Sequence, residues 1–164
     1  MLWKFLDKFY NHGDLPWVSL IWNAYYVGKV THHENLVGSF WWKDIMKLVN
    51  NFRGVTTVHM GNGSTFSFWH DNWWLDGSFQ PAKERFPRLF SFAKMDSMSA
   101  AQVYGVQDLY SLFELPLSQL AHEELTKLQS IMANHQLQEE NDRWTYCWGI
   151  LIPRQSFIST SILI

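Results

Sequence analysis

The sequence contains only one cysteine, Cys147, among its 164 residues. A single thiol excludes an intrachain disulfide and any cysteine-rich zinc site within this chain. Because Cys147 lies in an alternating segment between tryptophans, we interpret it as a packed, unreactive thiol rather than a nucleophile. A chain without disulfides is expected in a reducing compartment, here the cytoplasm or the nucleus.

Long apolar runs are also missing from the sequence. The first residues, from Met1 to Lys8, are interrupted by charges and lack the continuous apolar stretch of a secretory signal. No stretch approaches the roughly 18 apolar residues in a row that a membrane-spanning helix needs. We therefore expect an intracellular chain that is not secreted and has no membrane partner.

Charged residues are scarce, at 17% of the chain against the roughly 25% usual for soluble domains. The formal net charge is −2, which excludes a strong overall electrostatic field. Residues 1–94 carry ten Lys or Arg against seven Asp or Glu, whereas residues 95–164 carry three against eight. A weakly basic first part is compatible with a nucleic-acid contact and equally with two ordinary solvated faces.

Motifs for metal, nucleotide or nucleophile chemistry are absent or incomplete. The run from His122 to Thr126 begins like a zincin helix, but Thr126 stands where the second metal ligand should be. No P-loop, dinucleotide-binding glycine fingerprint or Gly-x-Ser-x-Gly elbow is present. Asp71 and Asp76 are interpreted as turn residues that bond their own backbone rather than as paired acids. We expect no metal, no cofactor, no small-molecule substrate and no enzymatic activity, and a metallohydrolase is disfavoured.

Aromatic residues are abundant, with ten Trp, twelve Phe and six Tyr, and this load argues against intrinsic disorder. We interpret it as surface meant to be covered by another part of a larger protein. Trp69, Trp73 and Trp74, beside Trp41 and Trp42, could form a stacking platform for bases or sugar rings. The alternative is that these indoles pack a hairpin against a neighbouring helix.

Apolar residues at helical spacing predict about five helices. These expected helices fall at residues 2–10, 16–26, 39–53, 99–103 and 118–132. Ser39 is the expected N-cap of the third, and Gly54 is expected in the left-handed conformation just past its end. Ser99 with Gln102 forms a capping-box signature, whereas residues 81–87 are expected to be irregular.

After the third expected helix, the spacing of apolar residues changes from the helical period to the alternation typical of strands. Residues 55–60 are rich in β-branched side chains, and Gly61-Asn62-Gly63 supplies a tight turn before the alternating residues 65–69. The run from Arg143 to Trp148 alternates in the same way. The predicted fold class is α+β, mostly helical with one β-hairpin at about 55–69 and a short C-terminal strand at about 143–148.

Several motifs occur in a fixed order along the chain. They are Phe40-Trp41-Trp42-Lys43-Asp44-Ile45, Phe52-Arg53-Gly54, the run from Gly61 to Trp73, Phe86-Pro87-Arg88-Leu89-Phe90, Pro116-Leu117-Ser118, Glu123-Glu124-Leu125 and the run from Asp142 to Gly149. The series resembles the polyproteins of plant LINE-type (non-LTR) retrotransposons, in the segment between the reverse transcriptase palm and thumb and the zinc-binding region. The resemblance covers about residues 1–149. Its structural motif positions are Trp41, Trp42, Asp44, Gly61, Asn62, Gly63, Phe68, Trp69, Asp71, Trp73, Phe86, Pro87, Leu89 and Trp144.

The resemblance implies an RNA-directed DNA polymerase for the parent protein only. The family's polymerase holds two metal ions on a pair of adjacent aspartates, and this chain contains no Asp-Asp pair. The family's zinc ligands are expected beyond the last strand. Residues 1–149 are therefore expected to act as a non-catalytic connector, the remnant of a truncated reverse transcriptase, that positions the zinc-binding segment.

Three cations on or next to the expected third helix are candidate contacts to template–primer RNA or DNA. They are Lys43, Lys47 and Arg53, of which Lys43 and Lys47 lie one helical turn apart and so share a face. Through the parent polyprotein they would bind backbone phosphates. The alternative from another class is a Trp-rich ligand- or carbohydrate-binding module, which needs exposed, coplanar indoles.

The tail, residues 150–164, departs from the family pattern. Codons available to residues 150–158 can be read in another frame as N-S-N-S-S-S-K-F-Y, which restores that pattern. Our hypothesis is a single-base deletion near Gly149, a point that the coding DNA tests. Such a frameshift would leave the strand at 143–148 without its partner, and exposed unpaired strands aggregate.

Overall fold

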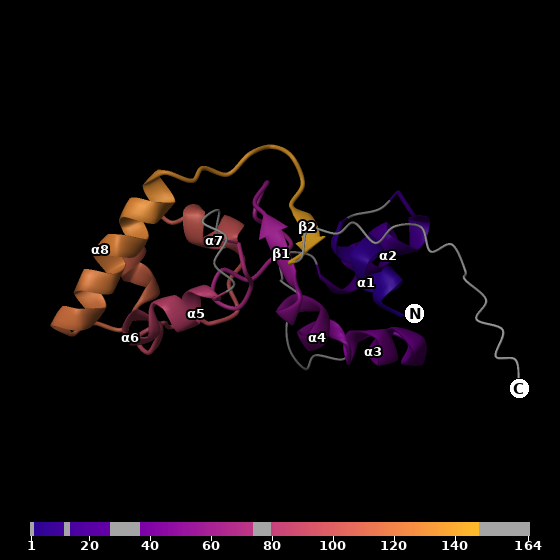
Figure 1. The fold of residues 1–164 in the computed structure, drawn as a ribbon, viewed down its shortest axis with the longest axis horizontal. Coiled ribbons are helices and arrows are strands. Elements are labelled where there is room, and N and C mark those ends of the chain that lie inside the picture. Colours follow the sequence, from indigo (N-terminus) through magenta and orange to yellow (C-terminus); the bar gives the residue numbers. More distant parts are fainter. Residues whose placement is uncertain (1, 12–13, 27–36, 74–79, 148–164) are drawn as a thin grey trace, which may run out of the picture.

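The computed structural model describes residues 2–11, 14–26, 37–73 and 80–147. In chain order the elements are α1 (Trp3–Tyr10), α2 (Pro16–Tyr25), α3 (Phe40–Met46), α4 (Val49–Gly54), β1 (Thr56–His59), α5 (Ala82–Arg85), α6 (Pro87–Phe90), α7 (Ala100–Tyr104), the 3-10 helix η1 (Leu109–Leu112), α8 (Gln119–Ala133) and β2 (Arg143–Tyr146). The chain is therefore mostly helical with a two-stranded antiparallel sheet, and the α+β class is confirmed. In Figure 1 the sheet lies between a group formed by α1 to α4 and a group formed by α5 to α8.

Serine side chains begin three of the helices, as their positions in the sequence predict. The Ser39 hydroxyl accepts a hydrogen bond from the Trp42 amide at 3.3 Å, and the Ser118 hydroxyl accepts one from the Ala121 amide at 3.2 Å. Ser99 and Gln102 form the predicted capping box. Each cap satisfies an amide that the first helical turn cannot pair.

The expected third helix is in fact two helices, α3 and α4, separated by a turn at residues 47–48. Buried residues of both helices reach the same core, with Trp42 on α3 and Phe52 on α4. Of the two adjacent tryptophans of α3, Trp42 is 1% exposed whereas Trp41 is 45% exposed. Gly54 is the last residue of α4 rather than a left-handed residue beyond it.

The predicted hairpin at 55–69 does not form. Strand β1 pairs with β2 instead, with Thr56 opposite Tyr146 and Val58 opposite Trp144. The strand expected near 143–148 is confirmed over residues 143–146, and it has a partner, contrary to the expectation from the frameshift hypothesis. In the segment expected to return, only Ser67 forms a bridge, with Ser99. Residues 148–164, and with them the whole divergent tail, lie outside the described residues.

Both edges of this small sheet are occupied at one position. The Val58 amide donates to the Asn72 carbonyl at 2.7 Å, on the side away from Trp144. On the other edge, the Asn11 side chain accepts from the Trp144 amide at 2.7 Å and donates to its carbonyl at 3.2 Å. Asn11 thus takes the place of a third strand, and an edge that would otherwise recruit another chain is blocked here.

The core contains two groups of aromatic rings, one on each side of the sheet. In the first, Phe9 stacks on Trp22 with 4.5 Å between ring centroids, and Tyr10 packs on Trp144 at 4.6 Å. The second comprises Phe66, Phe68, Trp69, Trp73, Phe90 and Phe113. Large rings dominate the apolar area that such a fold removes from water.

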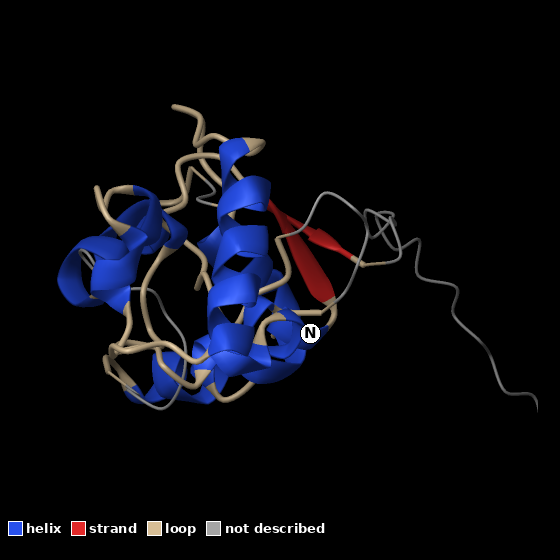
Figure 2. Cartoon of the chain, turned by 90° about the vertical axis from the view of Figure 1, so that its left-hand side faces the viewer, coloured by secondary structure: helices blue, strands red, loops and turns tan. Residues whose placement is uncertain are grey.

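The remaining helices are short or lie at the surface. Residues 81–87, expected to be irregular, contain α5 and the start of α6, which Pro87 begins. Helix α8 is the longest described helix, at 15 residues, and is the long upright helix of Figure 2; it packs on α6. Among the described helices, none has the length and apolar character needed to cross a bilayer.

Candidate functional site

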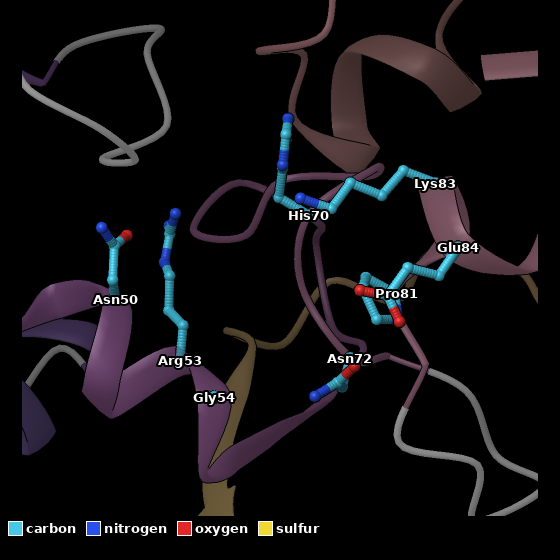
Figure 3. A pocket seen from close by; sticks show the side chains of 8 residues that line it. All are labelled: Asn50, Arg53, Gly54, His70, Asn72, Pro81, Lys83 and Glu84. Atoms are coloured by element: carbon cyan, nitrogen blue, oxygen red, sulfur yellow. The ribbon is translucent and has the colours of Figure 1, made fainter. Parts of the chain in front are cut away.

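A cavity of about 360 Å³ lies between α4, the segment after β1 and α5 (Figure 3). Its lining residues are Asn50, Arg53, Gly54, His70, Asn72, Pro81, Lys83 and Glu84. Asn50 and Arg53 come from α4, and Lys83 and Glu84 come from α5 on the other wall. The cavity therefore combines charged and amide side chains from three separate segments.

Arg53 is the buried charge of this cavity, with only 7% of the residue exposed. Its Nε lies 3.3 Å from Oδ1 of Asp71, whose side chain is fully buried. The guanidinium carbon lies 5.4 Å from the ring centroid of Tyr10 and 5.8 Å from that of Trp144. The Asp71 carboxylate and the rings of Tyr10 and Trp144 therefore hold the guanidinium in place. Its Nη1 and Nη2 have no hydrogen-bond partner among the described residues.

Asp71 has a larger role than its sequence context indicates. It was interpreted as a turn residue, and its Oδ2 does accept a local hydrogen bond from the Ser67 amide at 2.6 Å. The ion pair with Arg53 was not predicted. Asp76, interpreted in the same way, lies outside the described residues.

The remaining polar groups of the cavity were not predicted from the sequence. The Lys83 ammonium makes no ion pair or hydrogen bond with any residue of the described ranges. Asn72 is buried, and its Oδ1 has no hydrogen-bond partner within those ranges. The His70 Nε2 lies 3.7 Å from Oδ2 of Asp96. His70 and Asn72 lie within the motif run 61–73, but their meeting with Lys83 could not be predicted, because the fold brings these residues together from separate segments.

The three cations predicted to contact nucleic acid do not form one surface. Lys43 and Lys47 remain one turn apart, since the Lys47 amide donates to the Lys43 carbonyl. Lys47 is exposed, but its Nζ lies 2.7 Å from Oδ1 of Asp44, so its charge is locally balanced. Arg53 is buried and lines the cavity. Lys43, which is half-buried, is the cation of α3 whose charge is not balanced by an ion pair with a described residue.

The glycine-rich loop at residues 61–65 is held by Asp142, the first residue of the motif run 142–149, to which the sequence assigned no role of its own. Oδ1 of Asp142 accepts from the Gly61 amide at 2.9 Å and from the Gly63 amide at 2.8 Å. Oδ2 accepts from the Thr65 amide and hydroxyl, both at 2.9 Å. Asp142 is 2% exposed, and its full set of bonds explains how a carboxylate can be buried there. This clamp replaces the predicted hairpin turn.

The glycines of this loop are required by space and backbone conformation. Gly63 has a φ of +70°, and a Cβ there would lie 2.7 Å from the Ala101 nitrogen. A Cβ on Gly61 would collide with the backbone of Glu140. Asn62 joins the same contact, since its Nδ2 donates to Oδ1 of Asn141 at 3.2 Å. The predicted motif Gly61-Asn62-Gly63 is therefore a structural motif for docking onto residues 140–142.

Most of the large apolar motif residues belong to the core. Those below 5% exposure are Trp42, Phe68, Trp69, Trp73, Phe86, Leu89 and Trp144. Five of the eight tryptophans that the structure describes are buried, and the indole nitrogens of Trp42, Trp73 and Trp144 have hydrogen-bond partners. In this part of the chain the indoles therefore pack internally, and the stacking platform considered for Trp41, Trp42, Trp69 and Trp73 does not form among the described residues. The expected cover by another part of a larger protein stays a prediction, since Phe40 is 82% exposed and Trp41 is 45% exposed. Trp74 lies outside the described residues.

Metal and thiol chemistry find no support in the described ranges. No three His, Cys, Asp or Glu side chains gather there in a way that could hold a metal ion. Burial raises the pKa of the Cys147 thiol, which disfavours the nucleophilic thiolate. Tyr104, whose hydroxyl is also buried, has its pKa raised by burial to about 12. These groups are expected to stay neutral at physiological pH.

The chain matches no family model, no curated protein and no solved structure.

Proposed function

We propose that this chain is a non-catalytic connector, the remnant of a LINE-type reverse transcriptase polyprotein. In the intracellular parent, within the cytoplasm or nucleus, it positions the zinc-binding segment relative to the polymerase. The proposal rests on the resemblance and on what the motif residues do in the fold. They pack the core and join distant segments.

The observation that carries the proposal is the clamp of the glycine-rich loop by Asp142. It joins two motifs of the resemblance that are about 80 residues apart, with separations of 77 to 81 residues between bonded partners. Asp142 directly precedes β2, which is paired with β1 and tied to Asn11. The described chain therefore ends on a strand that is fixed from three sides. Such a strand can hold a segment that follows it in a fixed position relative to the rest of the fold.

The genomic DNA around the coding region tests the origin of the chain. We expect an upstream open reading frame with the polymerase's paired aspartates and a downstream array of Cys and His codons. A neighbouring frame after the Gly149 codon should also encode a Ser-rich, Phe-Tyr continuation. Flanks that encode neither the polymerase motif nor the Cys/His array would refute the remnant origin.

The contact to template–primer nucleic acid is tested by salt-dependent binding of the full chain to an RNA–DNA duplex. Replacing Lys43→Gln should weaken binding and reduce the slope of log K against log salt by about 1, because one phosphate contact is lost. The matched control is Lys127→Gln, at an exposed lysine of α8, which should change neither quantity. Binding that does not vary with salt would remove the phosphate contact.

A further inference from the structure

We propose that Asn62 is a deamidation site that the Asp142 clamp protects, and that the modification, once made, keeps the clamp from closing again. The Asp142 clamp is the set of hydrogen bonds from residues 61–65 to the Asp142 carboxylate. Asn62 is the only asparagine in the 164-residue sequence that glycine directly follows. The inference does not need the retroelement origin.

The reaction needs only the Asn-Gly pair and water. The Gly63 backbone nitrogen attacks Cγ of Asn62 and forms a new C–N bond, while the bond from Cγ to Nδ2 breaks. The Gly63 amide proton passes through solvent to the departing nitrogen, which leaves as ammonia, and a succinimide ring remains. Water then adds to either ring carbonyl and opens the ring to aspartate or isoaspartate. Glycine favours the attack because it has no Cβ to hinder it.

In the folded chain the attacking nitrogen is already engaged. The Gly63 amide donates to Oδ1 of Asp142 at 2.8 Å, and Gly63 itself is buried. The same carboxylate accepts hydrogen bonds from Gly61 and Thr65. Attack at Cγ requires the Gly63 nitrogen to turn away from this carboxylate, so the clamp must open first. Hydrogen bonds to an ionised acceptor are about twice as strong as neutral ones, which makes this opening rare.

The side chain of Asn62 is held as well. Its Oδ1 accepts from the Ser64 amide at 3.0 Å and from the Ser64 hydroxyl at 2.7 Å, and its Nδ2 donates to Oδ1 of Asn141 at 3.2 Å. These bonds fix the side-chain amide, whereas the reaction requires Cγ and the Gly63 nitrogen to come within bonding distance. Water is at hand, because Asn62 is half-buried and Ser64 is exposed. The reaction therefore depends on loop opening rather than on access of water.

The products do not fit the closed clamp. Both add a negative charge next to Asp142 and Glu140, which weakens the contact. Isoaspartate also lengthens the main chain between Gly61 and Gly63, because its Cβ becomes part of the backbone. The loop has no room for this: even a Cβ on Gly63 would lie 2.7 Å from the Ala101 nitrogen, and one on Gly61 would collide with the backbone of Glu140. Deamidation therefore releases the loop in one direction only.

The test follows Asn62 in the full 164-residue chain, folded at neutral pH and denatured in guanidinium chloride. Peptide fragmentation in a mass spectrometer locates the conversion of amide to acid, and an isoaspartyl methyltransferase with a labelled methyl donor detects isoaspartate. We expect the folded chain to react at least about a hundredfold more slowly, because only the open loop reacts. Equal rates in the two states would overturn the proposal.

Asp142→Asn separates the clamp from the rest of the fold. It keeps the shape of the side chain and removes its charge, so the folded chain should deamidate at Asn62 about tenfold faster. The matched control Glu139→Gln removes an exposed carboxylate nearby and should leave the rate unchanged. Leu125→Ala, at a fully buried position of α8, weakens the whole fold without touching the clamp and should also leave it unchanged.

Two results with these variants would overturn the proposal. A rate that rises as much in Leu125→Ala as in Asp142→Asn would assign the protection to global stability. A slower reaction in Asp142→Asn would mean that the carboxylate promotes the attack as a base instead of preventing it. If Asp142→Asn does not fold, the comparison of folded and denatured parent chain, together with Leu125→Ala, decides the matter.

Hydrogen exchange tests the release of the loop. In a chain that has been deamidated and refolded, the amides of Gly61, Gly63 and Thr65 should exchange at least about tenfold faster than in the unmodified chain. The amides of α8 should keep their protection, since the clamp does not involve this helix. Unchanged exchange at the three loop amides would overturn the one-way release.

Discussion

The segment at residues 61–73 and helix α8 satisfy the hydrogen bonds of their backbones in opposite ways. Most of the segment is buried although it contains no regular helix or strand, whereas α8 has 15 regular residues with only Ala121, Leu125 and Leu128 buried. The helix satisfies its own backbone and needs only a narrow apolar stripe. The buried segment depends on side chains, since Asp142 and Asp71 accept hydrogen bonds from its amides. In this protein, a buried carboxylate accepts the amide hydrogen bonds that a neighbouring strand would otherwise accept. The stability of the segment therefore depends on that carboxylate.

The largest effect is expected from Asp142→Ala. It leaves the buried amides of Gly61, Gly63 and Thr65 without acceptors, so the free energy of unfolding should fall by about 3–5 kcal/mol. Urea unfolding followed by tryptophan fluorescence measures the change. Asp142→Asn, which keeps one acceptor oxygen, should lose less.

The control for this variant is Glu139→Ala, at an exposed position nearby, with an expected change within about 0.5 kcal/mol. If Asp142→Ala unfolded at the same urea concentration as the parent chain, the contrast between a carboxylate-held segment and a self-sufficient helix would be wrong.

A smaller effect on stability is expected when a buried leucine in the apolar stripe of α8 is shortened to alanine. Leu125 is fully buried, so Leu125→Ala should lower the free energy of unfolding by about 2–4 kcal/mol through lost burial and a residual cavity. Leu120→Ala on the same helix removes the same atoms from a side chain that is 57% exposed. Its effect in the same urea titration should be under about 1 kcal/mol. Equal losses at both positions would mean that α8 is not anchored by its stripe.

The smallest effect is expected from alanine substitutions at two glycines, which should change the stability of the chain in opposite directions. Gly63→Ala places a Cβ 2.7 Å from the Ala101 nitrogen at a φ of +70°, so it should destabilise the chain by about 1–3 kcal/mol. Gly54 has nothing within 4 Å of an added Cβ, and Gly54→Ala at the end of α4 should raise stability by up to about 1 kcal/mol. Differential scanning calorimetry of the two variants should show melting temperatures shifted in opposite directions. Shifts of the same sign would contradict the constraint on the loop.

These contrasts explain which parts of the fold were predictable. Helix starts at Ser39, Ser99 and Ser118 depend on residues three positions away, so a local pattern contains the information. The hairpin failed because the acceptor for its turn amides is Asp142, about 80 residues later. A local turn signal cannot reveal a distant competitor.

The candidate site was predictable only in part, for a related reason. Arg53 was singled out as a cation, but its ion pair with Asp71 and its burial follow from the packing of α4 on later segments. Lys83 has no distinguishing neighbours in the sequence, and Asn72, although inside the motif run 61–73, has no assigned role there; both line the cavity only because the fold brings them together. The aromatic load was interpreted as surface to be covered by another part of a larger protein, and the sequence did not distinguish buried rings from exposed ones, as Trp41 and Trp42 show.

The bond between Asn11 and Trp144 has a consequence for synthesis of the chain. It closes a loop of 133 residues, and β2 finds β1 only across most of the sequence. Contacts so far apart slow folding, because the chain between them must first be confined. On the ribosome, the rings of α1 must wait for Trp144 to emerge before their side of the core can be completed. The nascent chain should therefore stay sensitive to protease until β2 has left the exit tunnel, and then close in one late step.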